Sequence, residues 1–334
     1  MSSSTGVSTV DTVGNGPAGG SGDRASTGRL GDRLFGGAAT GAGILVIVLV
    51  ALVAAFLLTQ AIPSLAKDHV NFLTSREWDV DGSVLKFGIV DLLWVTVVSA
   101  VVAMLIAVPL GVGVALFLTQ YAPKRIAAPM GYLIDLLAAV PSIVYGLWAA
   151  RIFGQHLAGV QSLMSSALGW LPLFGKTSIT PASTIFVASV VLAIMVLPIV
   201  TALSRDVFDQ TPATHKEGAL ALGATKWEMI RTSVLPFGRP GVISAAMLGL
   251  GRALGETIAV SIILSVVAPG SPFSWSLFNG GETFAAKIAN NAQEFDNPTK
   301  AGAFIAAGLV LFVLTFIVNA IARIVIERRK AFSE

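Results

Sequence analysis

The chain has 334 residues, of which 54% are hydrophobic and only 12% are Asp, Glu, Lys or Arg, and its mean hydropathy is +0.79. Because a soluble domain carries roughly 25% charged residues, this composition indicates an integral membrane protein. The net charge of +3 is small and the basic residues stand in short loops, so the pI of about 9.3 reflects membrane topology and not a nucleic-acid-binding surface. The absence of cysteine excludes disulfides, thiol nucleophiles and thiolate metal sites.

The N-terminal segment differs from the rest of the chain. Residues 1–35 are rich in Ser, Thr, Gly and Asp, so they cannot bury enough apolar surface to offset the entropy of ordering, and we predict a disordered cytoplasmic tail. The apolar run 37–62 is too long for the core of a signal peptide, and no obvious cleavage site follows it. It predicts a first transmembrane helix over 36–63, ending at Pro63.

Five further apolar runs reach the roughly 20 residues that a helix needs to cross a bilayer. Pro109, Pro141 and Pro198 lie inside them with glycines nearby, which membrane helices tolerate where neighbouring groups satisfy the freed backbone. The fold class is therefore an all-α integral membrane protein with six transmembrane helices. The five runs cover residues 88–118, 126–150, 181–203, 242–267 and 301–326.

The distribution of basic residues between these runs predicts the orientation. Fourteen of the 22 Lys and Arg fall in the N-terminal tail, the segments near 124 and 205–239, and the C-terminus, against seven in the alternate segments. Since Lys and Arg concentrate in short cytoplasmic loops, both termini and the 205–239 loop are predicted to be cytoplasmic in a multi-pass plasma (inner) membrane protein.

The loop at 205–239 contains signals for two short helices. Pro212 suits a first helical turn, Thr214 and Glu217 have capping-box spacing, and Gly223 can end the helix in a left-handed conformation. The small residues Gly218, Ala219 and Ala221 on this helix would let another protein approach closely.

A second helix is predicted directly afterwards. Thr225 and Glu228 have the same capping-box spacing, and Leu235 followed by Pro236 is expected to stop this helix. The product is a bent helix pair. It either transmits a push from another protein into the membrane or only links two spans.

Two charges interrupt the apolar run 242–267. A charge near the middle of a spanning helix costs roughly 2.5 to 3.5 kcal/mol on insertion scales, so Arg252 must be paired, hydrated or functional. Glu256 stands four residues on and is placed to pair with it. Either the two neutralise each other inside the bundle, or Arg252 offers its donor fork to an oxyanion while Glu256 orients the guanidinium.

Asp135 is a further acid inside an apolar run, ahead of Pro141. A structural hydrogen-bonding role is favoured for it, with lining of a solute pathway as the alternative.

The three histidines stand in separate loops without ligand spacing, and no nucleophile has a base and an orienting acid near it. We therefore expect no metal, no cofactor and no catalytic residue.

The 205–239 loop resembles the EAA loop of ABC-importer permeases. That pattern runs E-A-A, three residues, G, nine residues, I-x-L-P. Gly218 replaces an alanine and Ser233 the isoleucine. The matching positions, which the resemblance implies contact an ATPase, are Glu217, Gly218, Ala219, Gly223, Leu235 and Pro236.

The chain from about residue 85 onward also resembles the phosphate permeases of the PstC type. The segments that carry the likeness are IAVPLGVGVALFLTQYAP, VPSIVYGLW, LPIVTALSRDVF and GRALGETIAV. The resemblance implies a type I importer (MetI-like) permease domain over 84–327, with its coupling loop at 205–240, preceded by one extra helix and followed by a cytoplasmic C-terminus at 328–334.

The resemblance further implies how such a chain works. We expect a permease subunit that imports inorganic phosphate, without catalytic activity of its own, beside a second related permease, two cytoplasmic ATPase subunits and an external phosphate-binding protein. Arg252, Glu256 and Asp135 are the candidate pathway residues. An ABC permease for sulfate or molybdate remains an alternative, as does a secondary transporter that uses Glu256 and Asp135 as proton carriers.

Overall fold

The computed structural model describes residues 28–82, 84–295 and 297–330 and divides into two compact units, Met1–Leu52 and Val53–Glu334. In the first unit, the described residues begin helix α1 (Gly28–Leu65), and their side chains are exposed from Gly31 onward. Most of the predicted tail, residues 1–27, lies outside the described residues, whereas residues 28–35 are helical. The prediction that Pro63 ends the helix is wrong by two residues, because a proline so close to the end removes only one backbone hydrogen bond.

The second unit is built mainly of helices. Residues Trp78–Asp79 (β1) and Lys86–Phe87 (β2) form a two-stranded antiparallel hairpin. The long helices are α2 (Val90–Leu116), α3 (Lys124–Ala138), α7 (Ile185–Asp209), α10 (Leu235–Leu254) and α13 (Pro298–Lys330). The short helices are α4 (Ser142–Trp148), α5 (Gly154–His156), α6 (Ala158–Leu168), α8 (Ala213–Ala221), α9 (Lys226–Met229), α11 (Ile258–Ile263) and α12 (Phe284–Asn290). Single turns of other helix types are the π-helical η1 (Phe117–Tyr121), η2 (Ala149–Phe153) and η5 (Ile230–Val234), and the 3₁₀-helical η3 (Pro172–Phe174), η4 (Pro181–Ser183) and η6 (Ala292–Glu294).

Five helices in the described residues are long and apolar enough to cross a membrane, and a sixth span results if the bent pair α3 and α4 is counted as one. The prediction of six spans in an all-α fold is therefore confirmed, with two of them different in form. The third, expected as one run over 126–150, bends by 86° between Ala138 and Ser142. The fifth, expected over 242–267, begins earlier, ends at Leu254 and is followed by the separate short helix α11.

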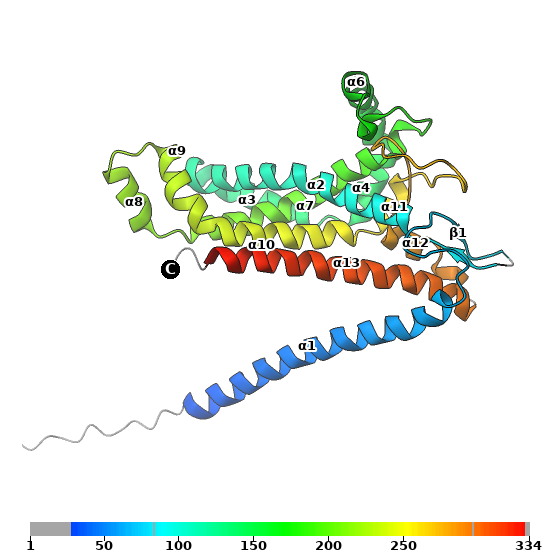
Figure 1. The fold of residues 1–334 in the computed structure, drawn as a ribbon. Helices are drawn as coiled ribbons and strands as arrows, with labels where there is room; N and C mark the ends of the chain where they lie inside the picture. The colour runs from blue at the N-terminus through cyan, green and yellow to red at the C-terminus, as the bar shows by residue number, and fades with distance from the viewer. Residues whose placement is uncertain (1–27, 83, 296, 331–334) are drawn as a thin grey trace, which may run out of the picture. The chain divides into compact units, whose positions relative to one another are not determined.

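Helix α7 is the centre of the bundle, and its neighbours α2 and α10 pack along it (Figure 1). Of its most apolar 18-residue window, 72% is buried. Small residues allow the close contact: a Cβ at Gly111 of α2 would lie 3.0 Å from Val200, and a Cβ at Gly249 of α10 would lie 2.6 Å from Val196. This is the packing expected where helices associate by close approach and not by exclusion of water.

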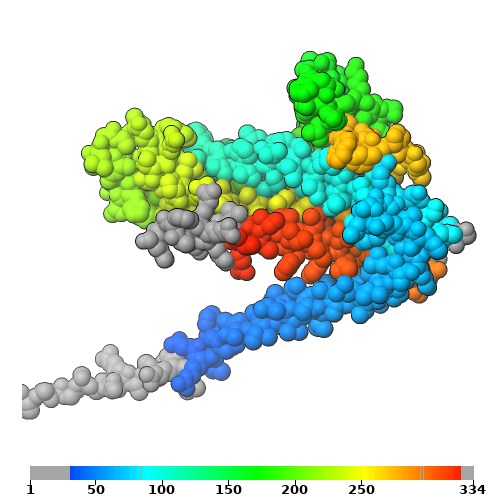
Figure 2. Space-filling view, viewed as in Figure 1, coloured from blue at the N-terminus to red at the C-terminus, as the bar shows by residue number. Residues whose placement is uncertain are grey.

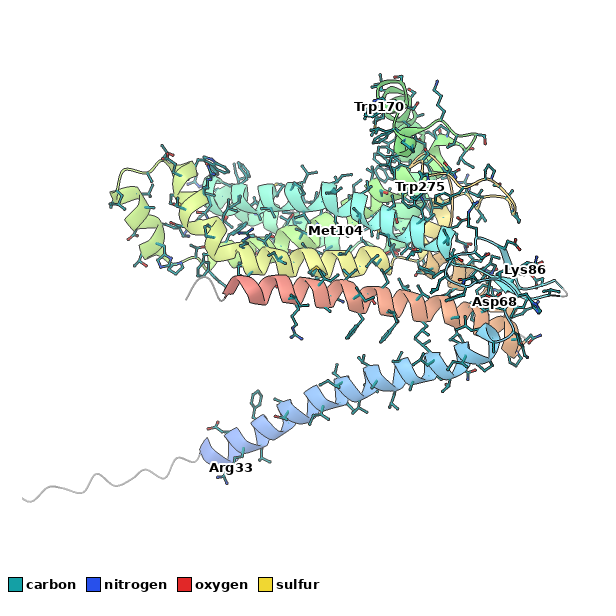
Figure 3. All side chains as sticks on the ribbon, in the orientation of Figure 1. Arg33, Asp68, Lys86, Met104, Trp170 and Trp275 are labelled. Atoms are coloured by element: carbon teal, nitrogen blue, oxygen red, sulfur yellow. The ribbon has the colours of Figure 1, made fainter. Side chains whose placement is uncertain are left out.

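The two ends of the bundle carry different elements. Helices α8 and α9 lie at one end, and α11, α12 and the β-hairpin lie at the other (Figure 1). Helix α6, green in Figure 2, projects from the bundle near the hairpin end. Trp170 follows α6 and is 77% exposed, while Met104 lies along α2 within the bundle (Figure 3).

Candidate solute site and coupling segment

Two interrupted helices meet in the bundle. Helix α4 begins after the 86° bend that follows α3, and α11 begins after α10 has ended at Leu254. The two short helices pack together so tightly that a Cβ at Gly146 of α4 would lie 2.9 Å from the Cα of Ala259 in α11. Interrupted spans of this kind are tolerated where the freed backbone groups are satisfied or line a cavity.

The first break follows from Pro141, which has no N–H to donate to the carbonyl of Leu137 four residues before it. That carbonyl accepts a hydrogen bond from the Val140 N–H at 3.3 Å and a second from the Tyr145 hydroxyl at 3.1 Å. Tyr145 therefore replaces the backbone bond that the proline removes. This role was not predicted, although Tyr145 stands in the VPSIVYGLW segment that carries the family resemblance.

The second break places Glu256 differently from the sequence-based prediction. The expected i, i+4 pair with Arg252 requires a continuous helix, but α10 ends at Leu254 and Gly255 follows it. Glu256, which is 9% exposed, instead accepts a hydrogen bond from the backbone N–H of Ala259 at 3.2 Å and caps the first turn of α11. The structure contains no ion pair between Arg252 and Glu256, and the proposed role of Glu256 in orienting the guanidinium has no support from this geometry.

Arg252 lies in the last turn of α10 with an exposed side chain. It faces a cavity of about 520 Å³ between α7, α10 and α13. Ile199, Met247 and Leu248 supply apolar wall, and the other polar side chains that line it are Ser244 and Asn319. A cationic fork in a cavity with two neutral polar groups can bind an oxyanion.

Asp135 is not part of this cavity. It lies on α3 beside a different hollow of about 520 Å³, which Gly131, Lys124 and Arg205 also line. Its carboxylate stands 4.0 Å from the Arg205 guanidinium of α7, and its side chain is 53% exposed. Arg205 also lies 3.5 Å from Asp206. The candidate pathway residues Arg252, Glu256 and Asp135 therefore lie in three different environments. The sequence did not predict that Asp135 lies beside Arg205.

The candidate coupling segment, residues 213–234, comprises α8, α9 and η5. Pro212 is the N-cap residue directly before the helix and does not lie in the first turn, where it was predicted. The capping box of Thr214 and Glu217 does not form, because Thr214 already lies inside the first turn. Gly223 ends the helix with φ of +86°, which confirms its left-handed role. The side chains of α8 are exposed or half-buried, and those of Glu217 and Leu222 are exposed. Leu222 is 91% exposed.

The second half of the segment is continuous with a membrane helix. The predicted capping box of Thr225 and Glu228 is present, with the Glu228 carboxylate accepting from the Thr225 N–H at 2.8 Å. Pro236 does not stop this helix. The π-turn η5 carries the chain past it, with the Leu235 N–H donating to the Ile230 carbonyl, and Pro236 lies in the first turn of α10. Lys226 to Leu254 thus form one helical run.

The helical run from Lys226 to Leu254 packs closely against α7. A Cβ at Gly238 would lie 2.6 Å from the ring of Phe208, so the Gly238 backbone packs directly against that side chain of α7. The segment around Gly238 and Pro240 is helical and belongs to α10. Along this run, Arg252 lies about 40 Å from the start of α9, at 1.5 Å per residue.

Several membrane-spanning helices, two of them interrupted beside a cationic side chain, define this chain as a solute-transporting membrane protein. The family model described as "Binding-protein-dependent transport system inner membrane component" matches residues 107–331. The chain belongs to this family and is a multi-pass inner membrane subunit of a binding-protein-dependent transport system. Within the family, it groups with the permeases of the PstC type, since curated relatives of that name are 53% and 54% identical to it over more than four fifths of the chain.

Curated relatives cover most of the chain. The "Phosphate transport system permease protein PstC 2" of Mycobacterium tuberculosis is 53% identical over 298 residues, which are 88% of this chain and 91% of that protein. The "Phosphate transport system permease protein PstC" of Mycobacterium leprae is 54% identical over 273 residues, 81% of this chain and 85% of that protein.

Solved structures agree in fold. A chain of the MetNI methionine ABC transporter in an inward-facing conformation superposes with a TM-score of 0.51 at 17% identity, covering 72% of this chain and 95% of that chain. The match confirms the MetI-like core.

Proposed function

We propose that the chain is the transmembrane permease subunit of an ATP-driven importer and that it moves inorganic phosphate across the inner membrane. The observation that carries the proposal is the 53% identity to a phosphate transport permease over 88% of the chain. The exposed Arg252, in a cavity that also contains Ser244 and Asn319, supports it, because a guanidinium binds the oxygens of a tetrahedral oxyanion in a bidentate manner. The names of the curated relatives favour phosphate over sulfate or molybdate.

Exposed surfaces of the single chain support the assembly that we propose. Helix α3 has an exposed apolar side that includes Ile126, Leu133 and Leu136, which fits burial against a second, related permease. The exposed surface of α8, with Leu220 47% and Trp227 of α9 55% exposed, fits a groove on a cytoplasmic ATPase subunit. ATP hydrolysis then occurs on two separate subunits, and an external phosphate-binding protein delivers the solute.

The orientation is part of the same proposal. Arg205, Lys216, Lys226, Arg231 and Arg239 lie on or beside the elements at the α8 end of the bundle, so the positive-inside tendency puts that end and both termini in the cytoplasm. Phosphate would enter at the hairpin end and leave at the α8 end. A proton-coupled carrier has no use for a coupling segment of this kind.

The test uses the whole complex, with both permeases and both ATPase subunits in vesicles that enclose the phosphate-binding protein with labelled phosphate. We expect ATP-dependent phosphate transport that excess sulfate or molybdate does not suppress. Arg252→Ala should lower transport at least tenfold, and Arg151→Ala, an exposed arginine in η2, should not. Near-normal transport by assembled Arg252→Ala complexes, or transport driven by a proton gradient without ATP, would contradict the proposal.

A further inference from the structure

Asn319 is an amide side chain in a part of the chain that crosses the membrane. It lies on α13, within the span Pro298–Ile324, and its side chain is exposed. Among the residues that the structure describes, no hydrogen bond from the Asn319 side chain is found, whereas Thr315 one turn earlier donates to the Phe312 carbonyl at 2.8 Å. An amide without a partner is costly in hydrocarbon, so Asn319 needs water, a solute or another protein beside it.

The cavity of about 520 Å³ that contains Arg252 also reaches Asn319 and Ser244. Ser244 lies eight residues before Arg252 on α10, which places it about 12 Å nearer the α8 end. Helix α13 lies beside α10 and runs in the opposite direction (Figure 1). The polar groups therefore continue from Arg252 toward the end of the bundle at which the coupling segment lies.

The chemistry of the two ends of this cavity differs. Arg252 is a permanent cation with several donors, whereas Ser244 and Asn319 are neutral. The Ser244 hydroxyl already donates to the Pro240 carbonyl at 3.0 Å, which leaves its oxygen as an acceptor. The Asn319 amide offers two N–H donors and one acceptor oxygen. Neutral groups hold an anion less tightly than a guanidinium does, since hydrogen bonds to charged groups are stronger when both partners are ionised.

We propose that Asn319, with Ser244 across the cavity, forms a second solute subsite on the release side of Arg252, and that it takes a partly protonated oxyanion such as phosphate. The amide N–H groups donate to the anionic oxygens. The amide oxygen and the Ser244 oxygen accept from the P–OH groups. Because the Asn319 subsite binds the solute less tightly than Arg252 does, the solute can leave Arg252 and is not retained at the second subsite. This subsite rests on the proposed function, because it deepens the same transport path.

The test is ATP-dependent phosphate transport by the complete complex in vesicles, with ATP hydrolysis stimulated by the binding protein measured in parallel. Asn319→Leu keeps a similar size and removes every hydrogen-bonding group, so transport should fall about two- to tenfold, the range of one neutral hydrogen bond. Asn319→Asp puts a negative charge in the path, and transport should fall more than tenfold. The phosphate carried per ATP should fall in both variants, and a variant that only damaged the fold would lose ATP hydrolysis in proportion.

Thr315→Val is the matched control, because its hydroxyl bonds to its own helix and lies one turn from Asn319. It should transport at the wild-type rate, and Asn319→Gln, which keeps an amide, should exceed Asn319→Leu. If Asn319→Leu and Asn319→Asp both transport within twofold of wild type, or if they lose only assembly and not transport per assembled complex, the subsite is overturned. If the wild-type complex carries no phosphate, the proposed function has failed, and that result is distinct from a failure at Asn319.

Discussion

The carboxylate of Glu256 accepts a hydrogen bond from the backbone N–H of Ala259 at 3.2 Å. Glu256 is 9% exposed and lies one residue before the N-cap Thr257, from where its carboxylate accepts from the N–H of the second residue of α11, as a capping side chain does. This bond fixes the point at which α11 starts. It also takes Glu256 away from Arg252, so the guanidinium remains available to the cavity.

Replacement of Glu256 should therefore affect stability through hydrogen bonding and not through charge. Glu256→Gln keeps a side-chain oxygen that can accept from Ala259, so the thermal unfolding midpoint of the purified complex should stay close to that of wild type. Glu256→Ala removes the cap and should cost about 1 kcal/mol. If Glu256→Gln were as destabilising as Glu256→Ala, the negative charge itself would be needed, and the capping interpretation would be wrong.

Gly223 provides a test of the coupling segment. Its φ of +86° is costly for a residue with a Cβ, by roughly 1 to 2 kcal/mol. Gly223→Val should therefore deform the junction of α8 and α9 and lower both phosphate transport and stimulated ATP hydrolysis. The matched control is Gly159→Ala, because Gly159 is inside α6, away from α8 and α9, and a Cβ there would meet nothing within 4 Å.

Gly159→Ala should leave transport unchanged and favour the helix by up to about 1 kcal/mol. Measurement of both rates in the same reconstituted complexes separates the two outcomes. Equal rates for Gly223→Val and wild type would show that the bend is not needed for coupling.

Asp135 gives a contrasting prediction. Its carboxylate is 4.0 Å from the Arg205 guanidinium, and half of its side chain is exposed, so the pair contributes no more than about 1 kcal/mol. Asp135→Asn should stay within about twofold of wild type in transport and should change the unfolding midpoint little. A loss of tenfold or more in fully assembled complexes would place Asp135 in the solute pathway.

Two of the local signals between α7 and α10 were predicted correctly, whereas the Thr214–Glu217 capping box does not form. The left-handed Gly223 and the Thr225–Glu228 capping box depend on residues within one turn of each other, and both are present. The length and apolar character of the spans likewise follow from composition, and the structure has the expected helices.

Other errors arose where the role of a residue depends on a break in its helix or on a residue from another helix. The helical spacing of Arg252 and Glu256 assumed a continuous helix, and the stop at Pro236 assumed that no π-turn would absorb the proline. The Arg205 partner of Asp135 comes from α7, which no spacing within α3 could indicate. Asn319 carried a usable signal, a polar side chain inside an apolar run, but neither its cavity nor its proximity to Arg252 follows from sequence alone.

Tyr145 offers the last prediction, because its hydroxyl bonds to the Leu137 carbonyl that Pro141 leaves without its usual donor. Tyr145→Phe removes one hydrogen bond and should destabilise the purified complex by about 1 kcal/mol. Pro141→Ala restores a backbone N–H at position 141, which can bond to Leu137 as in an unbroken helix.

In the Pro141→Ala background, Tyr145→Phe should therefore cost less than it does alone. The thermal unfolding midpoints of wild type, the two single variants and the double variant form a double-mutant cycle that measures this difference. Strict additivity would mean that the hydroxyl stabilises the bend in some way other than by satisfying the Leu137 carbonyl. A coupling free energy between the two substitutions would show that the Tyr145 hydroxyl supplies the hydrogen bond that Pro141 cannot donate to the Leu137 carbonyl.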